Sequence, residues 1–269
     1  MDELWEVHAL KYGERPARTR NESFLFDDDH LAPHPIDYFI WVIRNADRTI
    51  LVDTGYDPAE ATRRGRPILR HPVEALKSLG IAAEDVDTVI VTHMHYDHAG
   101  TLDSFPNATF HIQAAEMEYA TGPCMCMSAL KMPFSVEHVV QMVKHIYSGR
   151  VVFHDGDAGI APGVTVHAIG GHSRGLMSVR VKTAAGWLCL ASDASHFYEN
   201  FLTGKAFPIV VDVEAMYRGW DIIQGLASSP EQCVPGHDPL VFDLFPGTGI
   251  PDVIRLDQGA TGVLPPFGR

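Results

Sequence analysis

The sequence has no apolar run long enough to cross a membrane, because a spanning helix needs about 20 consecutive apolar residues. The first residues, from Met1 to Glu6, are acidic and lack the basic start and apolar core of a secretory signal peptide. We therefore expect a cytoplasmic protein that has no membrane partner.

Basic residues are also scarce. The chain holds 21 lysines and arginines against 34 aspartates and glutamates, which gives a formal net charge of -13 at pH 7. Since binding to a phosphate backbone needs a basic face, this balance argues against a nucleic-acid partner. The expected ligand is instead a neutral or weakly charged small molecule.

Cysteine is rare too, with four in 269 residues. Cys124 and Cys126 lie close in sequence, but there is no second close pair to complete a zinc site of four cysteines. In a chain without an export signal we expect reduced thiols rather than disulfides. With 46% hydrophobic and 20% charged residues the composition is that of an ordinary globular protein, long enough for one domain with a large core.

Short apolar segments bounded by turn residues predict a chain rich in strands. Strands are expected at residues 5–10, 36–43, 49–52, 86–91, 109–112, 151–153, 164–166, 177–181, 187–191 and 232–234. Helices are expected at residues 67–79, 113–121 and 215–226. A buried strand ends in Asp53 in the first half and in Asp193 in the second, which suggests two β-then-α halves that face each other.

The segment from about residue 113 to residue 149 is rich in methionine and has helical character. Because methionine is flexible and polarisable, Met125, Met132 and the nearby Phe134 are candidates for lining a pocket for an apolar ligand. For any single methionine, a contact between a helix and the core is the alternative interpretation.

The strongest signal is the stretch 92–100, directly after the expected strand 86–91. Its ligand-type residues are His93, His95, Asp97 and His98. Buried in a core, each of these side chains would need its own polar partner. Imidazole nitrogens and a carboxylate oxygen are ligands that zinc accepts, so the stretch predicts a metal site. An exposed turn that happens to be rich in histidine is the alternative.

Further ligands should come from other strand ends. Three residues meet that condition: His172 after two glycines, Asp193 after the strand 187–191, and His237 after a Pro-Gly turn. A single histidine is more often structural than a ligand. Three ligand-type residues at successive junctions between a strand and a turn favour a shared site.

The pattern His-x-His-x-Asp-His, then Gly-His, a strand-terminal Asp and a late Gly-His resembles the metallo-β-lactamase superfamily over residues 50–237. The stretches 92–100, 105–109 and 115–120 resemble its N-acyl homoserine lactonase branch. The resemblance implies an α/β fold, the four-layer αββα sandwich. It also implies a single domain over residues 1–269, with the methionine-rich helical insert, and two zinc ions at one edge. A homodimer is compatible with it.

The resemblance also assigns roles. One zinc ion would be held by His93, His95 and His172, the other by Asp97, His98 and His237, with Asp193 bridging them. The implied reaction is opening of a lactone ring, in the first place that of an N-acyl homoserine lactone (quorum quenching), by a hydroxide held between the metals. Asp97 would also shuttle a proton, and Asp53 would orient a ligand histidine.

One position departs from the branch. Its members place a tyrosine three residues after the bridging aspartate, where it contacts the substrate carbonyl; here that residue is His196. A histidine can donate the same hydrogen bond, so His196 is a candidate catalytic and substrate-binding residue, with Phe197 beside it. Tyr198 could take over only if the turn is altered. The departure leaves open another lactone, aromatic or pyridine-derived, in a catabolic pathway.

Other functions fit less well. Residues 171–175 match Gly-x-Ser-x-Gly, and Ser173, Asp193 and His237 follow the chain order of a serine-hydrolase triad. That motif requires a helix after the serine, whereas residues 176–181 alternate like a strand. A glutathione-thioester hydrolase would need a basic cluster, and the sequence reveals no clear one. A protein that binds lactones without cleaving them would not need the retained Asp97.

Overall fold

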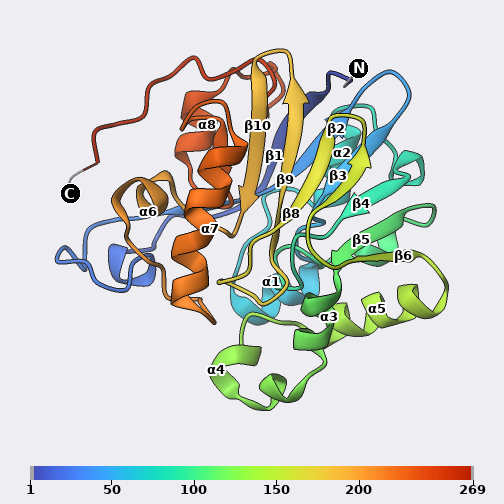
Figure 1. The fold of residues 1–269 in the computed structure, drawn as a ribbon, viewed down its shortest axis with the longest axis horizontal. Coiled ribbons are helices and arrows are strands. Elements are labelled where there is room, and N and C mark those ends of the chain that lie inside the picture. Colours follow the sequence, from blue (N-terminus) through green and yellow to red (C-terminus); the bar gives the residue numbers. More distant parts are fainter. Residues whose placement is uncertain (1–2, 268–269) are drawn as a thin grey trace.

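The computed structural model describes residues 3–267 and consists of two β-sheets packed face to face between helices (Figure 1). The larger sheet has seven strands in the order β12-β1-β2-β3-β4-β5-β6, and the smaller has five in the order β11-β10-β9-β8-β7. This arrangement confirms the predicted α/β fold class and its αββα sandwich.

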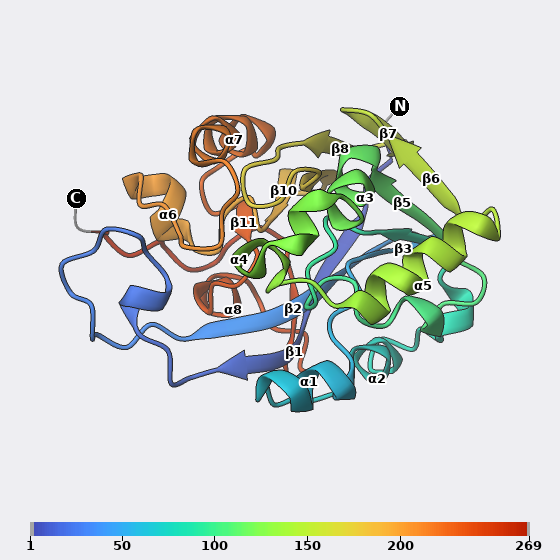
Figure 2. The same cartoon turned by 90° about the horizontal axis from the view of Figure 1, so that it is seen from below.

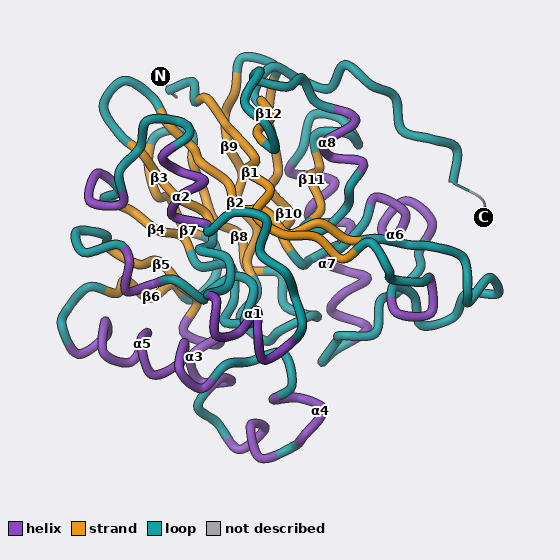
Figure 3. The backbone as a smooth tube through the Cα atoms, turned by 180° about the vertical axis from the view of Figure 1, so that it is seen from behind, coloured by secondary structure: helices purple, strands orange, loops and turns teal. Residues whose placement is uncertain are grey.

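The strands of the larger sheet are β1 (Glu6–Arg15), β2 (Ile36–Arg44), β3 (Thr49–Val52), β4 (Thr88–Ile90), β5 (Thr109–Gln113), β6 (Val151–His154) and β12 (Val253–Arg255). Those of the smaller sheet are β7 (Ala158–Ala161), β8 (Val164–Ala168), β9 (Met177–Thr183), β10 (Gly186–Ser192) and β11 (Cys233–Pro235). Strands fill the centre of the molecule and helices lie around them (Figure 3).

The helices form the two outer layers (Figure 2). Outside the larger sheet lie α1 (Pro58–Arg64), α2 (Pro72–Lys77) and α5 (Val136–Tyr147). Outside the smaller sheet lie α6 (Tyr198–Thr203) and α7 (Val213–Leu226), while α8 (Leu240–Leu244) follows β11. The segment predicted as a helical insert contains α3 (Ala114–Ala120), a 3₁₀ turn at Pro123–Cys126, α4 (Ser128–Lys131) and α5. Among the described helices, none is both long and apolar enough to cross a membrane.

The strand β2 explains why the sheets are covered on both faces. Its side chains alternate between the core that separates the sheets and the core beneath the outer helices. The first group is Phe39, Trp41 and Ile43, and the second is Tyr38, Ile40 and Val42. All six are buried, and full burial of one such side chain contributes roughly 1.5–3 kcal/mol. The near-continuous apolar run of this strand therefore requires a layer on each side.

Parallel strand pairs decide where the loops meet. In the larger sheet β3 pairs in parallel with β4, and in the smaller sheet β10 pairs in parallel with β11. Carboxyl ends of parallel neighbours lie at the same edge of a sheet. The loops after these four strands carry all but one of the ligand-type residues that the sequence singles out, and both sets of loops open at one edge of the sandwich. The exception is His172, which lies in the loop between β8 and β9 of the smaller sheet.

Most strands lie within a residue or two of their predicted positions, but one helix is much shorter than expected. The prediction placed a helix over residues 67–79, whereas α2 begins only at Pro72, with His71 as its N-cap. The preceding Ile68 pairs instead with Gly13 in an isolated antiparallel bridge. The four cysteines are free thiols, as expected.

Candidate metal centre

The histidine-rich loop follows β4 and packs on the turn that follows β3. The backbone N–H of Thr54 donates to the carbonyl of His98 at 2.7 Å, and that of Gly100 donates to the carbonyl of Gly55 at 2.6 Å. A Cβ at Gly100 would lie 2.5 Å from that same carbonyl oxygen, so only glycine allows this approach. The packed loops bring polar side chains from two neighbouring strand ends together.

Two groups of three ligand-type side chains converge at this edge. In each group the candidate ligand atoms lie within 4.8 Å of one another. The first group is His93, His95 and His172, and the second is Asp97, His98 and His237. These are the sets that the resemblance assigned to the two metals. Each set combines residues of the loop after β4 with a histidine from the smaller sheet.

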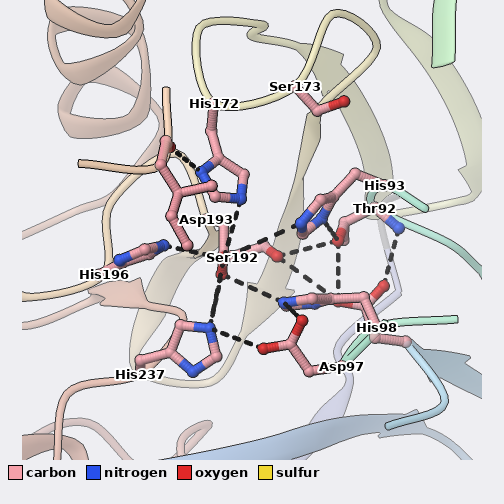
Figure 4. Close-up of polar contacts among 12 residues, drawn as sticks. Thr92, His93, Asp97, His98, His172, Ser173, Ser192, Asp193, His196 and His237 are labelled. Carbon is pink, nitrogen blue, oxygen red and sulfur yellow. Dashed lines mark hydrogen bonds and ion pairs between the residues drawn. The ribbon is translucent and has the colours of Figure 1, made fainter. Parts of the chain in front are cut away.

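Asp193, directly after β10, lies between the two groups (Figure 4). Its Oδ1 is 3.4 Å from Nε2 of His98, and its Oδ2 is 3.2 Å from Nε2 of His172 and 3.9 Å from Nε2 of His93. Nε2 of His237 is 3.2 Å from Oδ1 and 3.3 Å from Oδ2. One oxygen of the same carboxylate therefore faces each group, so that Asp193 could bridge two metal ions.

Four of the histidines place Nε2 near Asp193 and are oriented by a contact of the second ring nitrogen, Nδ1. Nδ1 of His172 lies 2.6 Å from the carbonyl of Ile209, and Nδ1 of His237 lies 2.9 Å from the carbonyl of Asp37. For His98 the partner is Oδ2 of Asp53 at 2.7 Å, and for His93 it is Oγ1 of Thr92 at 3.1 Å. A carbonyl or carboxylate at Nδ1 fixes the proton there and leaves the Nε2 lone pair free for a metal.

The protein atoms alone leave this centre with unpaired polar groups. Nε2 of His93, His98 and His172 and Oδ1 of Asp193 are buried and have no hydrogen-bond partner among the described residues. Leaving a buried polar atom unpaired costs about 1–3 kcal/mol. A cation among these atoms would satisfy all four, and the donor set of imidazoles and carboxylates is one that zinc accepts. The residues therefore fit a metal pair.

The electrostatics suit ligands too. Burial and the neighbouring imidazoles lower the pKa of His93 and His95 well below the usual range, which keeps both rings neutral. Burial would raise the pKa of Asp193, but His237, His98 and His196 outweigh it and hold that pKa well below its usual range. Burial would lower the pKa of His98 and His237 as well, but the carboxylate of Asp193 outweighs it and raises both. A metal ion bound beside Asp193 would displace the protons of these two rings, because metals bind neutral imidazoles and an ionised carboxylate.

The hydroxyl of Thr92 links the two sheets behind the centre. It lies 2.8 Å from Oδ2 of Asp53 and 2.9 Å from the hydroxyl of Ser192. Asp53 and Ser192 end corresponding strands of the two sheets, and both have left-handed backbones, with φ of 60° and 49°. This conformation is unfavourable for residues other than glycine and persists only where the surroundings hold it. The polar link provides that restraint.

Comparison with known proteins identifies the family. The sequence profile of the metallo-β-lactamase superfamily matches residues 35–246. The chain belongs to the metallo-β-lactamase superfamily. An N-acyl homoserine lactonase from Bacillus cereus is 29% identical over 173 residues, which cover 63% of this chain and 60% of that enzyme. The match thus takes in less than two thirds of that relative's length.

Solved structures share this superfamily fold. A quorum-quenching N-acyl homoserine lactone lactonase superposes with a TM-score of 0.74 at 22% identity, covering 89% of this chain and 95% of that chain. A dizinc quorum-quenching lactonase in complex with a product gives a TM-score of 0.67 at 17% identity, covering 97% of each chain. At these identities the likeness establishes the fold.

A cavity of about 310 Å³ opens in front of the candidate metal centre. The sequence-predicted residues that line it are His95, Asp97, Met132, His172, Asp193, His196 and His237. His196 stacks on Phe207, with ring centroids 3.9 Å apart, and its Nε2 lies 3.0 Å from Oδ2 of Asp193. Burial lowers the pKa of His196 to about 3, so the ring is neutral. His196 therefore contacts the central carboxylate from the side of the cavity.

Three of the predicted substrate contacts lie elsewhere. Phe197 is buried against Phe24 and His34 and does not line this cavity. Met125 and Phe134 line a neighbouring cavity of about 760 Å³ beside α5. Phe134 still supports the centre, because its ring contacts that of His95 at 4.7 Å between centroids.

Glu116 in α3 is a structural residue of the site that the sequence prediction missed. Its fully buried carboxylate accepts the backbone N–H of Met94 at 2.8 Å, the hydroxyl of Ser173 at 2.5 Å and the N–H of Gly175 at 2.9 Å. It thus joins the histidine-rich loop to the loop that carries His172. No spacing rule reveals this role, although Glu116 falls in the stretch that resembles the lactonases.

The same contacts contradict the serine-hydrolase interpretation. Ser173 donates to Glu116, and the element that follows it is the strand β9 rather than a helix. Asp193 and His237 contact each other and the other histidines of the centre. The Gly-x-Ser-x-Gly match is therefore a coincidence of sequence.

Proposed function

We propose that this chain is a metal-dependent hydrolase that opens the ester ring of a lactone, with N-acyl homoserine lactones as the first candidates. The observation that carries the proposal is the position of Asp193, whose two carboxylate oxygens face two separate groups of three ligand-type side chains. The relatives named as N-acyl homoserine lactonases support the substrate class.

The proposed ligands are those of the two groups, shared through Asp193. Two zinc ions held there would lower the pKa of a water molecule and polarise the ester carbonyl. To bind a metal, each ligand histidine must be neutral and must present the lone pair of Nε2. The contacts of Nδ1 with Ile209, Asp37, Asp53 and Thr92 support that tautomer.

Asp97 is the proposed proton carrier. In ring opening a water oxygen adds to the carbonyl carbon, the bond between that carbon and the ring oxygen breaks, and a proton must reach the released oxygen. The carboxylate of Asp97 lines the cavity and stays 3.7 Å from Nε2 of His237 and 3.9 Å from Nε2 of His98. Because both distances are longer than a hydrogen bond, the oxygens of Asp97 are free to accept that proton and return it. Tyr12 anchors this residue by donating to its backbone carbonyl at 2.8 Å.

The apolar surroundings support an acyl chain in the substrate. A second cavity of about 440 Å³ shares Met132, Pro133 and Ile209 with the first and continues along the apolar side chains of Leu130 and Val211. Such a wall suits a hydrocarbon chain that extends away from the lactone ring.

An aromatic or pyridine-derived lactone is the second candidate. The observation that favours it is His196, which stands where the lactonase branch has tyrosine and which lies in an aromatic stack with Phe207. An aromatic ring fits such a flat surface, because offset and edge contacts between rings are favourable.

The test is to load the protein with zinc and measure acid release from N-acyl homoserine lactones of increasing chain length and from aromatic lactones. Turnover of the acyl compounds supports the first candidate, and turnover of aromatic lactones alone supports the second. His95→Ala should lose activity and also lower the zinc content measured by mass spectrometry. His30→Ala, the matched control at an exposed histidine outside the ligand set, should keep both. A zinc-loaded wild type that opens no lactone contradicts the proposal.

A further inference from the structure

Four arginines line the cavity in front of the metal centre, in a chain whose net charge is -13. They are Arg15, Arg18, Arg64 and Arg66. The first two belong to the end of β1 and the loop after it, and the other two to the end of α1 and the residues that follow. The sequence shows no such cluster because the two pairs are far apart in the chain.

A short backbone pairing brings these segments together. Gly13 in β1 forms an isolated antiparallel bridge with Ile68, and the N–H of Leu69 donates to the carbonyl of Tyr12 at 2.9 Å. The end of β1 and the chain that follows α1 therefore run side by side. Their arginines reach the same cavity as His95, Asp97 and His237.

Two of the arginines are already paired. Nη2 of Arg15 lies 2.9 Å from Oε1 of Glu22, and Nε of Arg64 lies 2.6 Å from Oε2 of Glu60. Among the described residues that line the cavity, Glu22 is the only carboxylate outside the metal centre. The carboxylate of Glu22 offsets the charge of Arg15, and that of Glu60, which Arg63 shares, offsets part of the charge of Arg64.

The other two arginines have nitrogens that no described residue satisfies. Arg18 is 7% exposed; its Nη2 donates to the backbone carbonyl of Glu22, but its Nε and Nη1 have no hydrogen-bond partner among the described residues. Its nearest carboxylate oxygen belongs to Glu22, 3.9 Å away, which already pairs with Arg15. Arg66 forms no ion pair with any described residue and its buried Nε lacks a partner; its polar neighbours are the hydroxyls of Tyr38 and Tyr96.

A buried guanidinium with unpaired N–H groups is costly, because arginine stays protonated in proteins and presents five N–H donors. Its planar edge matches a carboxylate, which can accept two parallel hydrogen bonds from it. Two such groups beside one cavity form a site for an anion. Divalent cations bound at the candidate metal centre would offset the negative charges of Asp97 and Asp193. Those carboxylates would then not repel an anionic ligand from the cavity.

We propose that the substrate carries a carboxylate in addition to the ring that is opened, and that Arg18 and Arg66 bind this carboxylate. The inference rests on the proposed lactone hydrolysis and narrows it to anionic lactones. The paired Arg15 and Arg64 form the edge of the site, and the adjoining apolar cavity takes the hydrocarbon part of the molecule.

A matched pair of substrates tests the proposal. N-glutaryl homoserine lactone ends in a carboxylate, and its terminal primary amide has nearly the same shape without the charge. The zinc-loaded enzyme should show a kcat/KM at least about tenfold higher for the carboxylate, mainly through a lower KM, because hydrogen bonds to charged groups are the stronger ones. Equal values for the two compounds would overturn the inference.

Variants separate the arginine site from general damage. Arg66→Gln should lower kcat/KM for the carboxylate about tenfold and leave the value for the amide unchanged, so that the amide reports an intact fold and metal centre. Arg63→Gln is the matched control, since Arg63 lies on the same segment, is exposed and does not line this cavity. It should leave both values unchanged. A loss for the amide equal to that for the carboxylate would contradict the assignment.

A binding measurement keeps this result distinct from the proposed function. If the enzyme opens neither lactone, the panel of N-acyl and aromatic lactones decides the proposed hydrolysis, and calorimetry with glutarate decides the anion site separately. Glutarate should bind the zinc-loaded wild type at least about tenfold more tightly than it binds Arg66→Gln. Equal affinities would refute the anion site, whatever the enzyme hydrolyses.

Discussion

Replacing Asp53 with asparagine should weaken metal binding although Asp53 belongs to neither ligand group. The carboxylate is fully buried. Its Oδ1 accepts the backbone N–H of Thr92 at 2.8 Å, and its Oδ2 lies 2.7 Å from Nδ1 of His98. In Asp53→Asn the amide that keeps its oxygen toward Thr92 points its NH₂ toward His98.

The size of the effect follows from the tautomer of His98. An NH₂ opposite Nδ1 can donate only if the ring proton moves to Nε2, and that removes the lone pair that a metal needs. The reversed amide restores the contact with His98 but sets its NH₂ against the N–H of Thr92. Because either orientation opposes two donors, we expect zinc affinity at this position to fall about 10- to 100-fold, which corresponds to about 1.4–2.7 kcal/mol.

Competition with a chromophoric zinc chelator measures this loss directly. Asp57→Asn is the matched control, because Asp57 caps α1 by accepting the N–H of Glu60 at 2.8 Å and asparagine caps equally well. The control should bind zinc as the wild type does. An Asp53→Asn protein with wild-type zinc affinity would refute the argument that this carboxylate orients His98.

Two further predictions concern stability. Burial and the charges of Arg44 and Arg255 lower the pKa of His8 to about 4, so between pH 6.5 and pH 4 the unfolded chain binds a proton that the folded chain does not, and stability falls as the pH falls. Between pH 7 and pH 5, the free energy of unfolding in urea should fall by about 2 kcal/mol less in His8→Phe than in the wild type. An equal fall in the two proteins would contradict the role of His8. Gly175→Ala should lower the free energy of unfolding by about 1–3 kcal/mol, since its Cβ would overlap the backbone of Glu116, whereas Gly159→Ala, with open space around it, is the control. Equal stabilities of these two variants would show that the contact with Glu116 is not tight.

The sequence predicted those parts of the site that local signals encode. The strand before His93 is apolar, the loop after it is dense in ligands, and the strand that ends at Asp193 repeats the same plan. Since parallel neighbours end at the same edge, strand-end residues can be placed together without any knowledge of the packing. The sandwich followed from those strands together with the resemblance to a known superfamily.

The parts that the sequence could not predict depend on contacts between distant segments. Glu116 acts through donors on two loops that only the folded chain brings close. Arg18 and Arg66 share a cavity because Gly13 pairs with Ile68, and no periodicity marks a single bridge. The three-residue strand β12 pairs with β1 across almost the whole chain. A short strand of this kind has too little pattern of its own to be recognised.

The polar link through Thr92 has a consequence for the order in which the molecule assembles. Each proposed ligand set takes two side chains from the loop after β4 and one histidine from the smaller sheet. A half-folded chain with its sheets apart would offer neither set complete, so high-affinity zinc capture must follow the docking of the two sheets. Once bound, the ions would act as reversible cross-links between the sheets. Because they bind the folded state alone, they would slow the separation of the two halves as well as serve the reaction.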